Sequence, residues 1–396
     1  MDAICHIITK LELGGAQEVA LHAVSHLDRS QYRAMLIAGP GGILTEEARR
    51  LPHVDVHIIP ALGRQIRFLG DLVALIELTT LLRRLRPAVV HTHSSKAGIL
   101  GRWAAWLAGV PVIVHTVHGY GITPAQPRWL RSLLVLVERV TGWVTTHWIT
   151  VSQADLKKGR AWGLFRDNVS VIRPGIDPEP FQRQKGSKQS QRLNAEFGGA
   201  ASDKFVGTVA CLKPQKAPQD FIAVAKRVVA ARSDVHFVLV GDGELRPQVE
   251  ALIAQYGLSG RVHLAGWRRD IPAMMQTWDA FLLTSHWEGL PRVLLEARVS
   301  GLPLIATDVG GAAEVVTDPS IGSLRQAGDV QGLADTVLHV LGRREATASI
   351  PQRTSSALPA EFHICETVRQ YEQLYDRLLH AGAGGMSSGR GEIAAA

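Results

Sequence analysis

The segment 279–314 constrains the fold more than any other part of the chain. Two short apolar runs, 279–285 and 302–308, have the length and composition of buried strands. Between them, Pro291 suits the first position of a helix and Gly301 suits the position just past a helix end. The pattern predicts a strand, a loop, a short helix and a second strand. Such units build open α/β sheets, in which ligands bind at the loops that follow the carboxyl ends of the strands.

Two glutamates in this unit are candidate ligand-binding residues. Glu288 falls in the predicted loop, and Glu296 falls in the predicted helix, 292–300, whose first N–H groups can bind an anion. The sequence Glu288-Gly-Leu-Pro, followed by Glu296-Ala and then Gly-x-Pro, resembles the donor-sugar motif of the retaining GT-B glycosyltransferases of family 4. The resemblance implies that Glu288 is catalytic and holds the sugar ring, that Gly289 and Leu290 bind the donor beside it, and that Glu296 holds the ribose. The alternative interpretation is one surface glutamate and one that only stabilises its helix.

Composition and charge narrow the class of protein. With 396 residues, 46% of them apolar and 20% charged, the chain suits a globular α/β protein of two or three domains. Residues 1–180 hold 20 Lys and Arg against 14 Asp and Glu, so most of the net charge of +7 lies there. An anionic partner is therefore expected. A membrane surface fits better than nucleic acid, because no basic helix, zinc spacing or aromatic RNA-binding motif is present.

Cysteine usage and the amino terminus predict a cytoplasmic protein, with peripheral contact to the cytoplasmic face of the inner membrane as a further hypothesis. The three cysteines, Cys5, Cys211 and Cys365, are too few and too far apart in sequence for a disulfide framework, which favours a reducing compartment. The first residues lack a basic region followed by an apolar run, so no signal peptide is expected. No uninterrupted apolar stretch is long enough to predict a spanning helix.

A glycine pair near the amino terminus suits phosphate binding. An apolar strand, 3–8, leads through Gly14 and Gly15 into a helical pattern. Glycine lets a ligand approach the free N–H groups of a helix start, although such a pair is more often only a tight turn. In the family that the chain resembles, a glycine pair at this place faces the donor diphosphate, which implies donor-binding roles for both residues.

Two histidine-containing stretches follow predicted strands of the first half. One holds His91, His93 and Lys96, and the other holds His118 and Tyr120. We expect no metal site here, because lysine is cationic and no carboxylate or cysteine stands nearby in the sequence. Both stretches resemble the acceptor-side half of bacterial family-4 enzymes that build envelope polysaccharide. The resemblance implies that His93, Lys96 and Tyr120 bind the acceptor and that His118 is catalytic and steadies the transferred sugar, although a lone histidine is usually structural.

Two segments of the first half mix apolar and basic residues. A helix is predicted over 69–85, and Arg83, Arg84 and Arg86 near its end either complement the helix dipole or face phospholipid. The segment 129–149 combines tryptophan, leucine and arginine, which suits either a core or an interfacial surface.

The second half carries the remaining expected donor residues. Its first strand leads into a loop with Cys211, Lys213 and Lys216. Family members usually have an arginine where Cys211 stands and a lysine that matches Lys216, and both cations face the diphosphate. Lys213 is a candidate substitute for the missing arginine. The resemblance also implies that Gly241, in a Gly-Asp-Gly-Glu turn, and Trp267, at a strand exit that holds the nucleobase, belong to the donor site.

The resemblance covers roughly residues 1–380 and implies an α/β fold of the GT-B type. Two Rossmann-like domains would face each other across a cleft, and a C-terminal helix would cross back to the first domain. The expected acceptor-binding domain is 1–176, and the expected nucleotide-sugar-binding domain is 177–365. A crossover helix over 366–380 and a disordered tail over 381–396 would follow.

The implied activity is that of a hexosyltransferase acting in cell-envelope polysaccharide biosynthesis. It would move a sugar from a nucleotide-sugar, UDP-linked rather than GDP-linked, to a glycan or a polyprenyl-diphosphate-linked saccharide, with retention of configuration. No Asp-x-Asp sequence is present to hold a metal, so Lys213, Lys216 and the helix starts are expected to neutralise the diphosphate without a metal or another cofactor.

Two other functions remain open at this stage. A nucleotide-sugar epimerase can use the same two-domain fold and needs no acceptor. A glycosyltransferase-like protein that binds but does not catalyse is the second alternative, and Cys211 in place of the usual arginine is its one support. The sequence does not identify the sugar, the acceptor, the linkage or the oligomeric state.

Overall fold

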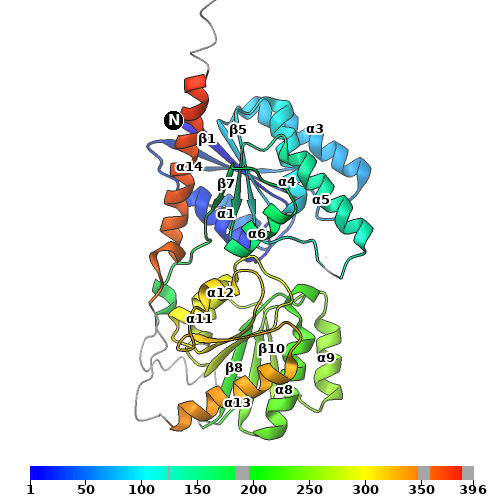
Figure 1. Ribbon diagram of the computed structural model, residues 1–396, viewed down its shortest axis with the longest axis vertical. Helices are drawn as coiled ribbons and strands as arrows, with labels where there is room; N and C mark the ends of the chain where they lie inside the picture. Colours follow the sequence, from blue (N-terminus) through cyan, green and yellow to red (C-terminus); the bar gives the residue numbers. More distant parts are fainter. Residues whose placement is uncertain (124, 183–195, 201, 347–356, 386–396) are drawn as a thin grey trace, which may run out of the picture. The chain divides into compact units, whose positions relative to one another are not determined.

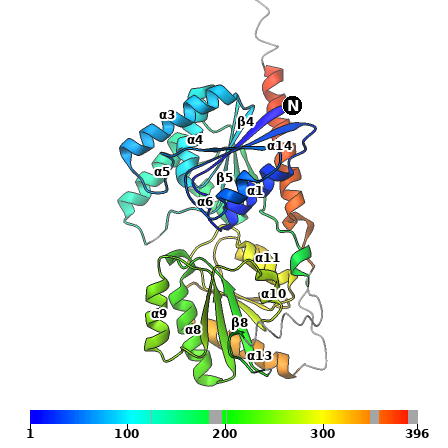
Figure 2. The ribbon, with the colours of Figure 1, turned by 180° about the vertical axis from the view of Figure 1, so that it is seen from behind.

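The computed structural model describes residues 1–123, 125–182, 196–200, 202–346 and 357–385. Contacts divide the chain into two units. Unit 1 comprises Met1–Gly175 and Ile364–Ala396, and unit 2 comprises Ile176–His363. Each unit is a parallel sheet covered by helices on both faces (Figures 1 and 2).

Unit 1 contains a seven-stranded parallel sheet in the order β3-β2-β1-β4-β5-β6-β7. Its strands are β1 (Asp2–Ile8), β2 (Tyr32–Ala38), β3 (Val54–Ile58), β4 (Val89–His93), β5 (Val112–Val117), β6 (His147–Thr150) and β7 (Val169–Val171). Its helices are α1 (Gly15–His26), α2 (Thr45–Arg49), α3 (Phe68–Leu85), α4 (Ser95–Ala108), α5 (Arg128–Gly142), α6 (Gln153–Ala161) and α14 (Ile364–Gly385). The direction in which strands are added reverses between the neighbours β1 and β4, which is where doubly wound sheets bind ligands.

Strand alternation sends neighbouring residues of β1 to opposite faces of this sheet. Ile4 packs with buried side chains of α1 and α14, whereas Cys5 and Ile7 pack with those of α3 and α4. His6, two positions after Ile4, therefore points to the face covered by α14. The same period places His91 of β4 on that face, because Val89 packs in the cluster with Ile4.

Helix α14 belongs to unit 1 although it follows unit 2 in sequence, which confirms the expected C-terminal helix that returns to the first domain. Its buried face contributes Tyr371, Leu374 and Tyr375 to the core of unit 1. The backbone N–H of Asp28 donates to the Glu372 carboxylate at 2.7 Å. The helix continues to Gly385, past the end expected at residue 380, and the expected tail beyond residue 385 lies outside the described residues.

Unit 2 contains a six-stranded parallel sheet in the order β10-β9-β8-β11-β12-β13, which reverses between β8 and β11. Its strands are β8 (Lys204–Val209), β9 (Val235–Val240), β10 (Val262–Gly266), β11 (Ala280–Leu283), β12 (Leu304–Thr307) and β13 (Gly322–Arg325). Its α-helices are α8 (Pro218–Ala231), α9 (Arg246–Gln255), α10 (Ile271–Met275), α11 (Arg292–Val299), α12 (Ala312–Val315) and α13 (Val330–Ala346). Short 3₁₀ turns are η1 (Glu179–Phe181), η2 (Pro214–Lys216) and η3 (Ala360–Phe362).

Both units have the Rossmann-like architecture expected from the sequence. The strand, loop, helix and strand expected over 279–314 are β11, a loop, α11 and β12, and Pro291 and Ser300 flank the helix as its caps. No helix among the described residues is both long and apolar enough to cross a bilayer.

Candidate active site

The switch point of unit 2 brings together two loops that are distant in sequence. The loop after β8 ends in the turn η2 with Lys216, and the loop after β11 carries Glu288. Because β8 and β11 are neighbours and parallel, their carboxyl ends meet at one edge of the sheet. Both expected donor residues therefore lie at the position where a doubly wound sheet binds its ligand.

Lys216 and Glu288 form an ion pair at this edge. The Lys216 ammonium lies 2.5 Å from Glu288 Oε1, and the two side chains are 20% and 6% exposed. Ser285 donates to the same oxygen at 2.6 Å, and Gln215 donates to Oε2 at 3.4 Å. The carboxylate is thus fixed by three donors, while the Lys216 side chain keeps part of its surface exposed.

The Glu288 loop has a defined backbone because a second glycine pair packs on it. The N–H of Gly311 donates to the Gly289 carbonyl at 2.6 Å. Gly310 has a positive φ of 55°, and a Cβ at this position would overlap the carbonyl oxygens of Glu288 and Gly289. Leu290, 7% exposed, anchors the loop in the core. The position 310 therefore needs glycine on two independent grounds.

The other expected donor residues of unit 2 lie on helix α11 and in the loops after β8, β9 and β10. Glu296 lies on α11 and is half-buried. Lys213 precedes η2 and is half-buried, and the Cys211 thiol donates to the Asp242 carbonyl at 3.2 Å. Gly241 follows β9 with φ of 131°, and Trp267 follows β10 and is 46% exposed. These three loops leave the carboxyl edge of the unit 2 sheet, as does the loop after β11 that leads into α11.

In unit 1, Gly14 and Gly15 stand where expected, at the start of α1. Gly14 is the N-cap residue and has an extended φ of 177°, and Gly15 is exposed. The neighbouring switch point has an unusual backbone, because Ser94 at the start of α4 has φ of 64° and ψ of 157°. Thr9, after β1, bonds to the Ser94 hydroxyl at 2.8 Å and accepts from the Ala97 N–H at 3.2 Å, which stabilises this turn.

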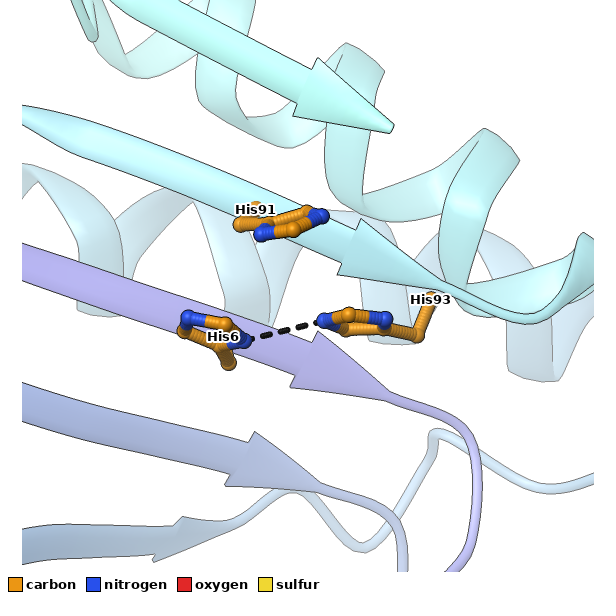
Figure 3. A group of neighbouring side chains, drawn as sticks. All are labelled: His6, His91 and His93. Carbon is orange, nitrogen blue, oxygen red and sulfur yellow. Dashed lines mark hydrogen bonds between the residues drawn. The ribbon is translucent and has the colours of Figure 1, made fainter. Parts of the chain in front are cut away.

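His93 and His118 are in direct contact. His118 follows β5 and is half-buried, and its Nε2 lies 2.9 Å from His93 Nδ1. His93 is fully buried and bonds through its other nitrogen to His6 Nδ1, also at 2.9 Å. Figure 3 shows His6 on β1 beside His91 and His93 on β4. A direct role of His93 in acceptor binding stays a prediction. The buried His93 ring is hydrogen-bonded to His118, which is the more exposed of the two.

The two other expected acceptor residues have partners within unit 1. The Lys96 ammonium lies 2.5 Å from Asp71 of α3 and also donates to the Gln65 carbonyl. Tyr120 is 8% exposed, and burial raises the pKa of its phenol. Its ring packs edge-on against the Trp162 ring, with 4.9 Å between the ring centroids. Their roles toward an acceptor stay predictions.

Sequence reasoning missed four side chains of these sites. His6, Asp71 and Ser285 each contact an expected site residue, and Tyr375 contacts His6. Ser285 lies within the predicted motif and could have been noted there. The other three come from elements far away in sequence, and a single sequence holds no local signal for such contacts.

The two Rossmann-like units, with polar side chains at the switch point of unit 2, fit a glycosyltransferase of the GT-B type, and comparisons with known proteins agree. Residues 190–355 match the family model of glycosyl transferases group 1, and residues 14–175 match that of the glycosyl transferase 4-like domain. The chain belongs to the family-4 glycosyltransferases of the GT-B fold and is an enzyme of the hexosyltransferase type.

Individual relatives extend over almost the whole chain. An Escherichia coli UDP-Gal:alpha-D-GlcNAc-diphosphoundecaprenol alpha-1,3-galactosyltransferase is 33% identical over 380 residues, which is 94% of this chain and 96% of that protein. The Staphylococcus aureus capsular polysaccharide biosynthesis glycosyltransferase CapM is 22% identical and covers 86% of this chain and 91% of its own length. Anabaena Alr3699/HepE, solved with UDP-glucose, has a TM-score of 0.80 at 21% identity and covers 95% of this chain and 100% of its own.

Proposed function

We propose that this protein transfers a hexose from a UDP-hexose to a saccharide carried on a polyprenyl diphosphate, for cell-envelope polysaccharide. The observation that carries the proposal is the full-length similarity to the Escherichia coli enzyme, whose name gives UDP-Gal as donor and a GlcNAc-diphosphoundecaprenol as acceptor. The HepE structure with UDP-glucose fits the same donor class. Galactose is accordingly the first sugar to test.

The ion pair of unit 2 supports the donor half of this proposal. Displacement at the anomeric carbon breaks the bond between that carbon and the diphosphate oxygen, so negative charge grows on the departing UDP. Lys216 can contact this diphosphate while Glu288, 2.5 Å from its ammonium, accepts hydrogen bonds from the sugar hydroxyls. Lys213 would add a second cation. Charge neutralisation by lysines requires no metal ion, so we propose a metal-independent reaction.

Retention of the anomeric configuration is part of the proposal. The acceptor hydroxyl would attack from the face that the diphosphate leaves, and its proton would pass to the departing phosphate oxygen. Glu288 is held by Lys216, Ser285 and Gln215, which suits a residue that positions the sugar better than a free nucleophile. His118 would donate a hydrogen bond to the transferred sugar.

A transfer assay tests the proposed function. The purified protein is incubated in EDTA with a synthetic GlcNAc-diphosphoryl lipid and, separately, UDP-Gal, UDP-Glc, UDP-GlcNAc and GDP-Man. We expect transfer from one UDP-hexose and an α-linkage in the product by NMR. Transfer that occurs only from GDP-Man, or only after magnesium is added, contradicts the proposal. Conversion of the UDP-hexose to its epimer without an acceptor supports the epimerase alternative instead.

Glu296 offers a test of the donor site itself. Glu296→Gln should weaken UDP-hexose binding by about tenfold to a hundredfold, because it loses one charged hydrogen bond of about 1.5–3 kcal/mol. Glu250→Gln, at an exposed position of α9, is the matched control and should bind as the unchanged protein does. Calorimetric titration with UDP measures both. Equal affinities for the two variants would remove Glu296 from the donor site.

Unit 1 also carries a surface that suits the membrane contact expected from its basic charge. Helices α3, α4 and α5 lie on one side of unit 1 in both views (Figures 1 and 2). Their exposed large apolar side chains are Phe68, Leu69, Leu72, Val73, Ile76, Trp106, Leu107, Trp129, Leu133 and Leu136. On α5, Trp129, Leu133 and Leu136 are spaced four and three residues apart and form one stripe. We propose that this apolar surface docks on anionic lipid, where a lipid-linked acceptor resides.

Vesicle sedimentation tests this membrane contact. The protein should sediment with vesicles that contain phosphatidylglycerol and much less with neutral phosphatidylcholine vesicles. The triple variant Trp129→Ser, Leu133→Ser, Leu136→Ser should lose most of this binding while it still binds UDP. Ile43→Ser is the control, because Ile43 is 52% exposed and lies outside these three helices. Equal sedimentation of the triple variant and the control would refute the proposed docking surface.

A further inference from the structure

Six side chains of unit 1, from Thr116 to His118, form one continuous series of hydrogen bonds. His118 Nε2 lies 2.9 Å from His93 Nδ1, and His93 Nε2 lies 2.9 Å from His6 Nδ1. His6 Nε2 lies 3.2 Å from the Tyr375 hydroxyl, which lies 2.6 Å from His91 Nδ1. His91 Nε2 lies 2.6 Å from Thr116 Oγ1. Four imidazoles from three places in the sequence are thereby linked to a tyrosine of α14.

The inner members of this series are isolated from solvent. Tyr375, Thr116 and the three histidines of Figure 3 are all 0% exposed. Burial lowers the pKa of His6 to about 3 and lowers the pKa values of His91 and His93 well below the usual value. These three imidazoles are therefore neutral at physiological pH. A neutral imidazole has one N–H donor and one bare nitrogen acceptor.

If the Tyr375 hydroxyl donates one of its two bonds and accepts the other, only two proton arrangements make every bond of the series. If Thr116 donates to His91, then His91 donates to Tyr375 and Tyr375 donates to His6. In the same direction, His6 donates to His93 and His93 donates to His118. All four imidazoles then carry their proton on Nδ1. If the direction is reversed, all four carry it on Nε2. A mixed series leaves either one pair of buried groups without a hydrogen bond or the buried Tyr375 O–H without an acceptor in the series, which is unfavourable.

We propose that Tyr375 is a positioning residue that, through His6 and His93, determines which ring nitrogen of His118 carries the proton. In the first arrangement His118 Nε2 accepts from His93, and His118 Nδ1–H is the donor that can meet a sugar oxygen. Tyr375 links His91 to His6 in this series, and α14 supplies it after the chain returns from unit 2. The use of Nδ1–H in catalysis rests on the proposed function, whereas the proton arrangement does not.

A metal site is the competing explanation of the same cluster. One nitrogen from each of His6, His91 and His93 lies within 4.8 Å of the others. Three nitrogens would have to converge on an ion at about 2.0–2.1 Å. Both nitrogens of each of these rings are instead hydrogen-bonded to protein partners, including a 2.6 Å bond between His91 and Tyr375. The geometry thus favours the hydrogen-bonded series.

Nitrogen-15 NMR of the full chain tests the inference directly. Ring nitrogen spectra recorded at pH 8, above the ordinary pKa of histidine, distinguish Nδ1–H from Nε2–H tautomers. We expect one shared tautomer for His6, His91, His93 and His118, and Nδ1–H is the one that lets His118 donate to the sugar as proposed. In Tyr375→Phe the series is cut, so His118 should show both tautomers. Transfer assays on the same variant should show kcat reduced about tenfold, with the KM for UDP-hexose changed less than about twofold.

Tyr32→Phe is the matched control for this experiment. The Tyr32 hydroxyl donates to Asp376 of α14, so the control also removes a phenolic bond to that helix, but it leaves the histidine series intact. It should keep the His118 tautomer and kcat of the unchanged protein, and comparison of the two thermal unfolding midpoints separates lost stability from lost positioning.

Three outcomes would overturn the inference: mixed tautomers in the unchanged protein, an unaltered His118 tautomer in Tyr375→Phe, or one equivalent of zinc in the purified protein. Failure of the proposed function is distinguishable from these. If no sugar is transferred but Tyr375→Phe mixes the His118 tautomers, the positioning role stands and the catalytic role of His118 falls.

Discussion

The Lys216→Met variant isolates the ion pair at the switch point of unit 2. It leaves the Glu288 carboxylate, 6% exposed, without its cation. Removing one partner of a buried ion pair costs about 3–5 kcal/mol. Two features reduce this cost: the Lys216 side chain is 20% exposed, and Ser285 and Gln215 still donate to the carboxylate. We expect about 2 kcal/mol, which lowers the Tm of a unit of this size by roughly 4–8 °C.

A double-mutant cycle assigns the cause of this loss. Glu288→Gln removes the carboxylate charge, so Lys216→Met combined with Glu288→Gln should regain most of the stability lost in Lys216→Met alone. UDP binding should not recover, because the cation proposed to meet the diphosphate is still missing. Lys226→Met is the control, since Lys226 is exposed on α8 and lies over the Tyr256 ring, a contact worth about 0.5–1 kcal/mol.

Scanning calorimetry with and without UDP measures both quantities, because a bound ligand stabilises the folded protein by RT ln(1 + [L]/Kd) and so raises the Tm more when its affinity is higher. Two results would refute the reasoning. A double variant as unstable as Lys216→Met would show that the unpaired carboxylate is not the cause. A Lys216→Met protein that UDP stabilises as strongly as the unchanged protein would show that Lys216 does not bind the diphosphate.

Three further predictions follow from the packing and the buried charges. Gly310→Ala should displace the Glu288 loop, because its Cβ would overlap the carbonyl oxygen of Glu288. The protein should still fold, and its affinity for UDP, derived from the rise in Tm on UDP binding, should fall at least tenfold. Glu138→Gln should destabilise unit 1 by about 2–4 kcal/mol in thermal unfolding, because the Arg102 guanidinium is 0% exposed and lies 2.7 Å from Glu138; equal stability would show that the charge is compensated elsewhere. Stability should also fall on acidification. The folded-state pKa of His6 is lowered to about 3 from 6.5, so the unfolded chain binds more protons than the folded chain between these pH values. The stability that neutral His6 contributes is therefore fully present above pH 6.5 and is lost as the pH falls toward 3. The loss is at most about 1.4 kcal/mol per pH unit for each such histidine. A Tm of unit 1 that is unchanged from pH 7 to pH 5 would contradict that reasoning.

Local pattern was enough to predict much of unit 2. The helix expected over 292–300 is α11, and the strands on either side of it are β11 and β12. These predictions succeeded because short apolar runs, an initiating Pro291 and a terminating Gly301 act within a few residues of the elements they define. The family, the fold and the enzyme class followed from the motif in this segment, since it is specific.

The sequence could not show which face of an amphipathic element is buried. On α3, Leu69, Leu72 and Ile76 recur at helical spacing, yet all three are exposed, and Leu78 and Leu82 are buried instead. Periodicity reports that apolar residues share a face, whereas the face that packs depends on the sheet and helices brought against it. The apolar surface proposed to dock on lipid is visible only once that packing is known.

The chain by itself therefore determined the two Rossmann-like domains, the returning C-terminal helix and the membership of the family. Tertiary structure alone decided which side chains act together. Lys216 reaches Glu288 because β8 and β11 are neighbours in the sheet, although 72 residues separate the pair. His6 and His93 meet because β1 and β4 are neighbours, and Tyr375 joins them from α14. Strand order and the return of a terminal helix are global properties of the fold, so no local pattern encodes these contacts.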